Sequence, residues 1–501
     1  MKLKTRHFIL ISIFMISFSI RIFFAGQTYY FSDSESYFNL RQIESIKKTG
    51  FPIYNDDLSF GGRNIIILPL YHYLFAGFSF IFPGIISLKI FSNFIASLLP
   101  IILYAISTQL VKKRNISLFS ALLAGFIPIF SKETVNSLNI LGLTIILVFL
   151  FIYFYIKFMR EKKNIDILLV ILISIVFTNH IGINLIVGLI IYIIISLLEK
   201  ITIERREFEF IFFSILFFLW TYFIIFKKAF QIHGLTIIWQ NVPKELLSNY
   251  FTRINLVETI YAIGIIPIIF GSIAIHSYIL KKKSKSMYII FGFFCSTFFS
   301  FWFKLIPIFP TIIFLGSTLI ILSIFFIKEF FIQIRKSKFA KYEKLFFNIF
   351  IIIAIITSVF PSILYMKQSI DNSFNSESIE PYIWLEKNSK KNNIILGAVE
   401  EGNLINYFGK RKNIIDTNYL LINDIDLIYN DTKTIFKASE INKFSAIRNI
   451  NKYDIDYIIF SDFAKKDYDI SEISYINQDC FELVFNKSTK IYKSECELTI
   501  N

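Results

Sequence analysis

The stretch ILGLTIILVFLFIYFYI at residues 140–156 contains no charged side chain, and a second charge-free stretch, IGINLIVGLIIYIIISLL, occupies residues 181–198. A helix needs about 20 apolar residues to cross the hydrocarbon core of a bilayer, so both stretches predict membrane-spanning helices. The 501-residue chain is 55% hydrophobic and contains 60 Phe and 26 Tyr. These features predict a polytopic, α-helical membrane protein.

About eleven spans are predicted when the apolar runs are read against the loops between them. Basic residues gather at positions 112–114, 157–163, 200–206, 281–285 and 328–344, and short loops rich in Lys and Arg face the cytoplasm. A cytoplasmic N-terminus puts all of these segments on the cytoplasmic side and the C-terminus outside. The predicted spans lie near residues 8–25, 86–111, 116–130, 138–157, 165–178, 181–198, 208–226, 260–280, 287–303, 308–327 and 345–365.

The net charge of +15 comes from these loop clusters and not from a stripe of alternating basic and aromatic residues. The sequence therefore favours contact with anionic membrane lipid and argues against a nucleic-acid partner. Residues 67–82 are also apolar, and we expect them to form a helix along the outer interface. The first apolar run resembles a signal peptide but is expected to stay as the first span of the cell-membrane protein.

Two domains are expected, a multi-span domain at residues 1–365 and a smaller one at residues 366–501. Three extracytosolic loops of the first domain, at residues 26–66, 131–139 and 227–259, are long or polar enough to carry a site. Beyond residue 365 the chain alternates helical patterns such as EPYIWLEKN with strand patterns such as NIILGAV and KYDIDYIIFSD. This alternation predicts a small extracytosolic α/β domain.

The last segment of the chain, CFELVFNKSTKIYKSEC, has the alternating pattern of a β-hairpin. It is bounded by Cys480 and Cys496. A disulfide between them is compatible with an extracytosolic location, but the sequence leaves the pairing open.

The acidic residues of interest stand in the outer loops. Asp33 and Glu35 lie in FSDSESYFNLR at residues 31–41, Glu133 lies in SKETVNSLN, and Glu258 ends NLVE. Carboxylates beside a membrane are costly unless they stay hydrated, pair with a cation or bind a metal. Mg²⁺ or Mn²⁺ prefers such oxygen ligands, and a carboxylate can act as a general base; ordinary solvated loop acids are the alternative. Transporters place their sites near the bilayer midplane, so this outer position favours an enzyme.

The same segments resemble a known family. ESYFNLR at residues 35–41 resembles the first-loop D-P-W-F-N-Y-R element of oligosaccharyltransferase catalytic subunits, with Asp33 two residues before it. The segment with Glu133 is similar to the acidic second loop, and NLVE to the third-loop motif whose terminal Glu approaches the acceptor. PLYHYL at residues 69–74 is similar to archaeal-type members. The resemblance extends over most of the chain and points to the GT-C superfamily of glycosyltransferases that use polyprenyl-phosphate-linked sugars.

This resemblance implies transfer of a sugar or glycan from a polyprenyl-linked donor to a glycan, lipid or protein acceptor outside the cytoplasm. It implies that Asp33 or Glu35 serves as base or metal ligand. Glu133 would complete a site for a divalent cation, Mg²⁺ or Mn²⁺, and Glu258 would orient the acceptor. The implied reaction is a direct displacement at the anomeric carbon.

Four further residues are expected to contact the substrate. Arg41 and Asn39 follow the first acidic motif, and the guanidinium of Arg41 either binds a donor phosphate or pairs with Asp33 or Glu35. His72 and His180 either touch the lipid phosphate or are interfacial aromatic residues. The sequence leaves these alternatives open.

The chain also departs from the family. Where an oligosaccharyltransferase has W-W-D-Y-G to read the Ser or Thr of an acceptor, this chain has AVEEG at residues 398–402. The second loop carries one acid, Glu133, where the family shows two. Protein N-glycosylation is therefore an alternative to the more general transfer reaction. Alternatives of another class are a non-enzymatic carrier or flippase for lipid-linked glycans, and a sensor with a receptor-like outer domain, which would leave the acidic loops unexplained.

Overall fold

The computed structural model describes residues 5–111, 113–239, 242–250, 255–276, 284–439, 441–476 and 480–495. The chain forms two compact units, each assembled from separated stretches of sequence. The first, here called the helical unit, comprises Met1–Tyr29, Leu68–Ile224 and Tyr250–Asn372. The second, here called the α/β unit, comprises Tyr30–Ile67, Ile225–Asn249 and Ser373–Asn501.

The α/β unit contains more of the chain than the predicted C-terminal domain. Its last stretch begins at Ser373, close to the predicted boundary at residue 366, but it also takes in parts of two predicted outer loops. The predicted two-domain division stays a prediction, because a compact unit is defined by contacts and not by the ability to fold alone.

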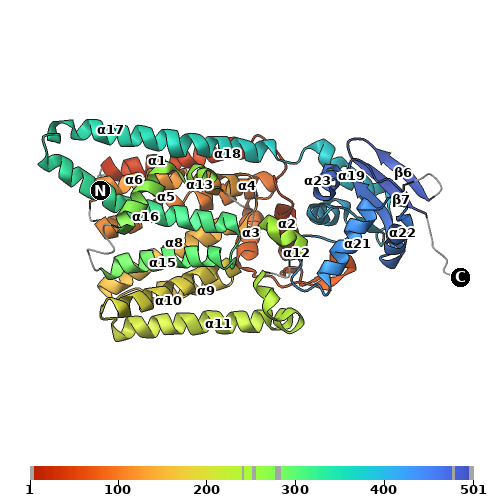
Figure 1. The fold of residues 1–501 in the computed structure, drawn as a ribbon, viewed down its shortest axis with the longest axis horizontal. Coiled ribbons are helices and arrows are strands. Elements are labelled where there is room, and N and C mark those ends of the chain that lie inside the picture. The colour runs from red at the N-terminus through yellow and green to blue at the C-terminus, as the bar shows by residue number, and fades with distance from the viewer. Residues whose placement is uncertain are drawn as a thin grey trace. The chain divides into compact units, whose positions relative to one another are not determined.

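Long apolar helices build the described part of the helical unit (Figure 1). Helix α16 is the most buried of the candidate spans, with 89% of its apolar window buried against 22% for α1. A helix that is apolar all round its circumference belongs in the interior. The helices are α1 (Thr5–Ala25), α3 (Leu70–Ile81), α4 (Ile85–Ala96), α5 (Leu99–Val111), α6 (Arg114–Gly125), α7 (Pro128–Val135), α8 (Ile140–Glu161), α9 (Ile165–Val176), α10 (Ile183–Leu198), α11 (Arg205–His233, which continues into the α/β unit), α13 (Leu256–Ile263), α14 (Ile265–Ala274), α15 (Lys285–Trp302), α16 (Ile308–Lys336), α17 (Glu343–Ala354) and α18 (Phe360–Asp371).

The prediction of a multi-span helical protein is confirmed. In the described chain, 7 helices are long and apolar enough to cross a membrane, or up to 9 if each of two bent pairs is one span. Helices α9 and α15 coincide with the two other predicted spans, so the total of eleven stays a prediction. The predicted interfacial helix is α3, whose depth in a membrane also stays a prediction.

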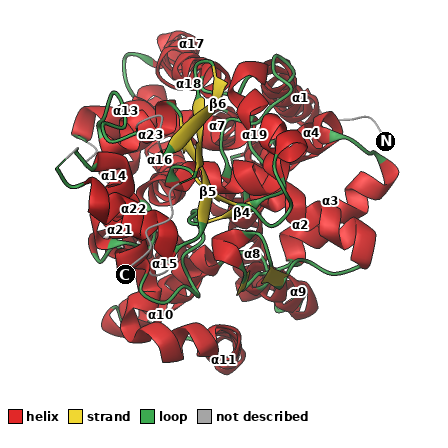
Figure 2. Ribbon diagram, turned by 90° about the vertical axis from the view of Figure 1, so that its right-hand side faces the viewer, coloured by secondary structure: helices red, strands yellow, loops and turns green. Residues whose placement is uncertain are grey.

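A mixed sheet forms the centre of the α/β unit (its strands are yellow in Figure 2). The strand order is β4-β3-β5-β7-β6, in which β3 pairs in parallel with β4 and β5, and β7 pairs antiparallel with β5 and β6. The predicted strands and hairpin are therefore confirmed. The strands are β3 (Ile394–Leu396), β4 (Lys412–Asn413), β5 (Ile455–Phe460), β6 (Phe481–Asn486) and β7 (Lys490–Ser494), and a separate short hairpin joins β1 (Asn55–Asp56) to β2 (Arg63–Asn64).

Helices of the α/β unit pack against this sheet through apolar stripes. In α21 the buried residues recur at helical spacing, at Ile425, Tyr429, Thr432, Ile435 and Phe436, which is the pattern of a helix with one face in a core. The helices of this unit are α2 (Glu35–Thr49), α12 (Lys244–Tyr250), α19 (Ser376–Asn388), α20 (Gly402–Leu404), α21 (Ile425–Lys437), α22 (Lys443–Lys452) and α23 (Asp462–Tyr468).

A small apolar cluster joins the three stretches of this unit. Val399, Ile415 and Tyr419 of the C-terminal stretch pack with Phe60 of the first outer loop and with Leu246 of the third. Burial of such side chains contributes about 1.5–3 kcal/mol each. Separated parts of the sequence therefore share one core.

One cysteine of the predicted pair can be described. Cys480, at the start of the hairpin, is disulfide-bonded. Its expected partner, Cys496, lies outside the described residues, so the predicted pairing is not tested. Cys295 in α15 is a free thiol.

Candidate active site

Asp33 lies directly before helix α2 in the α/β unit. Its Oδ1 accepts hydrogen bonds from the Ser36 backbone N–H at 2.7 Å and from Ser36 Oγ at 3.0 Å, and its Oδ2 accepts from Ser36 Oγ at 2.8 Å. A carboxylate here satisfies a free N–H of the first turn and faces the positive end of the helix dipole. Asp33 is half-buried, whereas Glu35, the first residue of α2, is exposed. The two predicted acids therefore have different environments.

The carboxylate of Glu400 influences Asp33. Burial, together with the negative charge of Glu400, raises the pKa of Asp33 to about 6 despite the hydrogen bonds from Ser36. Burial and Glu400 also raise the pKa of Asp467, in α23, to about 6. None of these three carboxylates forms an ion pair with any residue the structure describes. Like charges oppose ionisation. These carboxylates therefore bind a proton or a cation more readily than an isolated carboxylate would.

The stretch at residues 398–402, which departs from the family motif, forms a tight turn. Glu401 is fully buried, and its two oxygens accept from Tyr382 Oη at 2.6 Å and from the Ala398 N–H at 2.7 Å. Burial raises the pKa of Glu401 to about 7. Glu400, in contrast, is exposed. Glu401 therefore holds the turn together, and Glu400 is the acid of this stretch that solvent or a substrate can reach.

Gly402 allows two chain segments to approach each other closely. A Cβ atom at this position would lie 2.3 Å from the Ile415 carbonyl oxygen and 2.5 Å from Asp416 Cβ. Real side chains do not approach so closely. Glycine is therefore required here for packing, which explains why this position of the motif is retained.

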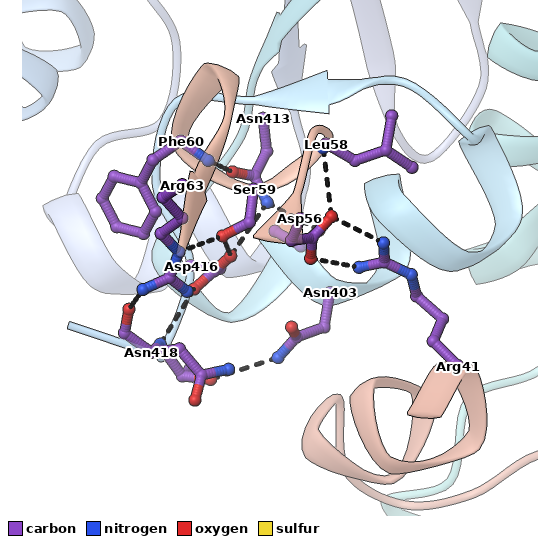
Figure 3. Close-up of polar contacts among 12 residues, drawn as sticks. Arg41, Asp56, Leu58, Ser59, Phe60, Arg63, Asn403, Asn413, Asp416 and Asn418 are labelled. Atoms are coloured by element: carbon purple, nitrogen blue, oxygen red, sulfur yellow. Dashed lines mark hydrogen bonds and ion pairs between the residues drawn. The ribbon is translucent and has the colours of Figure 1, made fainter. Parts of the chain in front are cut away.

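Arg41 pairs with a residue that the sequence did not suggest. Its guanidinium donates to both oxygens of Asp56, from Nη1 at 2.9 Å and from Nη2 at 2.8 Å (Figure 3). Although burial alone would raise it, this pairing holds the pKa of Asp56 below its usual value. Arg41 thus forms its ion pair with neither Asp33 nor Glu35, and a phosphate-binding role for Arg41 stays a prediction.

A second arginine–aspartate pair joins the first outer loop to the C-terminal stretch (Figure 3). The buried Asp416 accepts from Ser59 Oγ at 2.6 Å, from Arg63 Nη2 at 3.2 Å, from Asn413 Nδ2 at 3.3 Å and from the Asn418 N–H at 2.8 Å. Arg63 also donates to Ser59 Oγ and to the Asn418 carbonyl oxygen. Buried charges are tolerated only when paired and hydrogen-bonded in this way. This network fixes the loop that carries α2.

In the helical unit, the predicted acid Glu133 lies half-buried on α7. The preceding residue, Lys132, places its Nζ 5.6 Å from the ring centre of Phe309 and 5.8 Å from that of Tyr365. An ammonium group over aromatic faces is stabilised by their quadrupoles. Lys132 has no ion pair with a described residue, so its charge is held in place without being neutralised.

Helix α7 is positioned by the buried Arg21 of α1. Arg21 Nε donates to Asn93 Oδ1 at 3.0 Å, its Nη2 donates to Thr134 Oγ1, and its guanidinium lies 5.5 Å from the ring centre of Phe130. All three partners are uncharged. Thr134 and Phe130 belong to α7, so this arginine holds the helix that carries Lys132 and Glu133.

Glu258 lies in the first turn of α13, which packs against α7 and α16. It forms a capping box with Asn255, in which the Glu258 N–H donates to Asn255 Oδ1 at 2.8 Å and the Asn255 N–H donates to Glu258 Oε2 at 3.2 Å. Such a pair satisfies two free donors at a helix start. Glu258 is exposed, and Tyr261 of the same helix contacts Tyr365, with ring centres 5.8 Å apart. The structure thus brings the helices of Glu133 and Glu258 together.

His72 and His180 lie in adjoining segments of the helical unit. The backbone N–H of Leu70 at the start of α3 donates to the Phe177 carbonyl oxygen at 3.0 Å, which places the turn of His72 beside the turn that leads to His180. His72 is buried and His180 is half-buried. Asn39, on α2 of the α/β unit, is buried. Their predicted contacts with substrate are not tested.

The described residues contain no group of three or more His, Cys, Asp or Glu side chains that could hold a metal ion as they stand. Of the predicted ligands, Asp33 and Glu35 belong to the α/β unit and Glu133 to the helical unit. The pKa of Asp33 is raised, and Asp33 forms no ion pair with a described residue. A cation bound beside this carboxylate would stabilise its charge. The metal site stays a prediction.

Sequence reasoning missed three residues that the structure singles out, Glu400, Asp467 and Lys132. Glu400 and Lys132 stand inside motifs noted for other reasons, AVEEG and SKETVNSLN. An exposed acid at the position of a family acid was a usable signal for Glu400. Asp467 belongs to FAKKDYD, which has no distinguishing pattern, and only the fold brings it within electrostatic range of Glu400.

Comparison with protein-family models and with curated protein sequences gives no match. Solved structures do match. The Archaeoglobus fulgidus oligosaccharyltransferase in complex with Zn and sulfate has a TM-score of 0.68 at 13% identity, over 90% of this chain and 67% of that one. The archaeal oligosaccharyltransferase AglB from A. fulgidus, in complex with an inhibitory peptide and a dolichol-phosphate, has a TM-score of 0.71 at 12% identity, over 91% and 69%.

A second kind of protein matches over almost its whole length. ArnT from Cupriavidus metallidurans, bound to undecaprenyl phosphate, has a TM-score of 0.54 at 8% identity, over 98% of this chain and 97% of ArnT. At these identities the likeness concerns the fold. The chain has the fold of the GT-C membrane glycosyltransferases represented by AglB and ArnT.

Proposed function

We propose that this protein is a membrane glycosyltransferase that transfers a sugar or glycan from a polyprenyl phosphate or pyrophosphate to an acceptor on the extracytosolic face. The observation that carries the proposal is the fold likeness to two kinds of structures that were solved with a polyprenyl phosphate bound, dolichol-phosphate in AglB and undecaprenyl phosphate in ArnT. Because a fold alone does not define an activity, the residues must supply the chemistry.

Asp33 is the proposed general base. A base works best when its pKa lies near the working pH, and the pKa of Asp33, raised to about 6, meets this condition. The carboxylate takes the proton of an acceptor hydroxyl while the acceptor oxygen forms a bond to the anomeric carbon. The bond from that carbon to the phosphate oxygen breaks, and the polyprenyl phosphate leaves with the electron pair.

Lys132 is the proposed contact for the departing phosphate. Its ammonium is fixed over two rings and has no ion pair within the described chain. A fixed charge in a partly dry setting stabilises developing negative charge more than a solvated one. His72, His180, Asn39 and Arg41 remain proposed donor contacts.

The other predicted acids keep supporting roles in this proposal. Glu258 orients the acceptor, and Glu35 and Glu133 would hold a divalent cation. Asp33 would join them only as the alternative to its role as the base, because a bound cation lowers the pKa of a carboxylate. When bound, such an ion neutralises charge on the leaving group. A similar structure was solved with Zn, which supports a metal in that protein and a test for one here.

A true oligosaccharyltransferase that modifies Asn is the second candidate. It is favoured by the higher TM-scores of the oligosaccharyltransferase structures, one of which is tethered to an acceptor peptide containing the NVT sequon. The turn at residues 398–402 opposes it, because both oxygens of Glu401 already accept hydrogen bonds, from Tyr382 and from the Ala398 N–H, and Val399 is buried. Glycopeptide formed from a sequon-containing acceptor would establish this activity.

The proposal is tested with purified protein in detergent, radiolabelled polyprenyl-linked sugars and a set of acceptors, in Mn²⁺ and then in EDTA. We expect label to leave the lipid, and we expect Asp33→Asn to abolish this release. Asp57→Asn is the matched control, because Asp57 is an exposed acid of the same loop. Activity that survives EDTA would support a glycosyltransferase that does not need a metal ion.

The carrier alternative has a different outcome in the same preparation. Reconstituted into vesicles, a carrier moves labelled lipid across the bilayer without cleaving the sugar–phosphate bond. Movement without cleavage would refute the glycosyltransferase, and full activity of both Asp33→Asn and Glu35→Gln would refute the proposed site.

A further inference from the structure

A cavity of about 460 Å³ lies in the helical unit among the end of α8 and the starts of α9 and α11. These three helices are labelled in Figure 1. Its walls include the apolar side chains Leu169, Phe210 and Phe213, and its rim carries Lys162, Arg206 and Glu209. Pockets that bind small ligands typically measure about 300–1,000 Å³ and combine apolar walls with a few polar groups. This cavity has both properties, and none of the predicted site residues lines it.

The charges at the rim leave one cation unneutralised. Lys162 Nζ lies 2.6 Å from Glu204 Oε2, and Arg205 Nε lies 2.8 Å from Glu209 Oε1. Arg206 is exposed and forms no ion pair with a residue in the described ranges, and Glu204, the acid within electrostatic range of it, already pairs with Lys162. The acid of the rim is therefore already paired, and the free charge at the cavity is positive.

The position of the cavity indicates the chemistry of its occupant. Its rim belongs to the basic segments at residues 157–163 and 200–206, at the end of the spans where Lys and Arg gather. Phe212 and Phe213 of α11 are 54% and 48% exposed beside it, as expected for side chains that face lipid tails. Basic pockets between helices at this boundary bind anionic lipid headgroups.

We infer that this cavity binds an anionic glycerophospholipid of the surrounding membrane. The phosphate contacts Arg206, Lys162 is the second cation that lines the cavity, and one hydrocarbon chain lies along Leu169, Phe210 and Phe213. An arginine fork matches phosphate oxygens in geometry and charge. The inference is independent of the proposed reaction, because it uses none of the residues assigned to transfer.

The test measures lipid binding to the purified full-length protein in detergent by native mass spectrometry. We expect phosphatidylglycerol to bind more tightly than phosphatidylcholine, and Arg206→Ala to weaken phosphatidylglycerol binding about tenfold or more, since a hydrogen bond to a charged group is lost. Lys163→Ala is the matched control: Lys163 is an exposed cation of the same end that does not line the cavity. It should change binding less than about twofold, because an exposed charge that does not line the cavity is screened by solvent and salt.

A second variant tests the apolar wall. Leu169→Trp narrows the cavity and should reduce binding of both phospholipids, while thermal unfolding checks that the variant is folded. Equal binding of the two phospholipids, equal losses in Arg206→Ala and Lys163→Ala, or unchanged binding in Leu169→Trp would overturn the inference. Tighter binding of a polyprenyl phosphate than of phosphatidylglycerol at Arg206 would overturn it as well.

Discussion

Replacing Asp416 by Ala should strongly lower the local stability of the α/β unit. The substitution removes the acceptor of four hydrogen bonds, from Ser59, Arg63, Asn413 and Asn418. It also leaves Arg63, whose side chain is 6% exposed, without its ion-pair partner. Breaking a buried ion pair by removing one partner costs about 3–5 kcal/mol. A loss of about 4 kcal/mol is a large fraction of the stability of a domain.

Hydrogen exchange followed by mass spectrometry measures this loss in the full-length protein, because each peptide reports its own opening free energy. A loss of about 4 kcal/mol should speed exchange of the β3 and β5 peptides about a thousandfold. Asp57→Ala, at an exposed acid of the same loop, should stay within about 0.5 kcal/mol of wild type. A change below about 1 kcal/mol in Asp416→Ala would refute the idea that this network fixes the loop.

A double-mutant cycle isolates the pair itself. Arg63→Met combined with Asp416→Leu removes both charges, and buried pairs replaced together by apolar residues are often nearly neutral. The double variant should therefore be more stable than Asp416→Leu alone. Additive losses would show that the two residues are not coupled.

Three further predictions concern the candidate site. The transfer rate should rise as the pH increases through about 6, because the Asp33 base must lose its proton, and a flat pH profile would contradict this role. Burial raises the pKa of Glu401 from its usual 4.5 to about 7. The stability that this shift contributes, roughly 3 kcal/mol, is therefore complete below about pH 4.5 and is lost as the pH rises through about 7. Melting temperatures measured from pH 5 to 9 should fall in wild-type protein and should fall less in Glu401→Gln. Gly402→Ala places a methyl group 2.3 Å from a carbonyl oxygen and should lower stability by about 3 kcal/mol or more, and a wild-type melting temperature would contradict this packing.

The helices and strands were largely predictable because their signals are local. Charge-free runs such as residues 140–156 give long helices, and the alternating pattern of residues 481–494 gives the hairpin of β6 and β7. Each of these signals depends on residues a few positions apart. The mixed composition of the C-terminal stretch likewise predicted an α/β arrangement.

The assembly of the α/β unit was not predictable in the same way. Ser59 and Asp416 are 357 residues apart in sequence, and no periodicity relates them. The partner of Arg41 was missed for a geometric reason: Glu35 lies six residues before it, about 9 Å along the axis of α2. The β1–β2 hairpin instead brings Asp56 to the guanidinium.

The environment of the candidate base, Asp33, could not be predicted from local sequence either. The sequence identified Asp33 as an acid near a membrane boundary, but its raised pKa depends on burial and on Glu400, 367 positions away in the printed sequence. The influence of Glu400 on Asp467 also depends on the folded sheet and its helices. The sequence motif thus identified one acid, and only the folded structure shows which residues surround it.

The most direct test is a count of labelled sugar released from a polyprenyl phosphate by the purified protein. Wild-type protein and Asp57→Asn should release label in the presence of acceptor, and Asp33→Asn should release none while binding the lipid as before. Release by Asp33→Asn at the wild-type rate would contradict the assigned base. No release by wild-type protein with any donor, together with transport of intact lipid, would contradict the proposal that the protein is a glycosyltransferase.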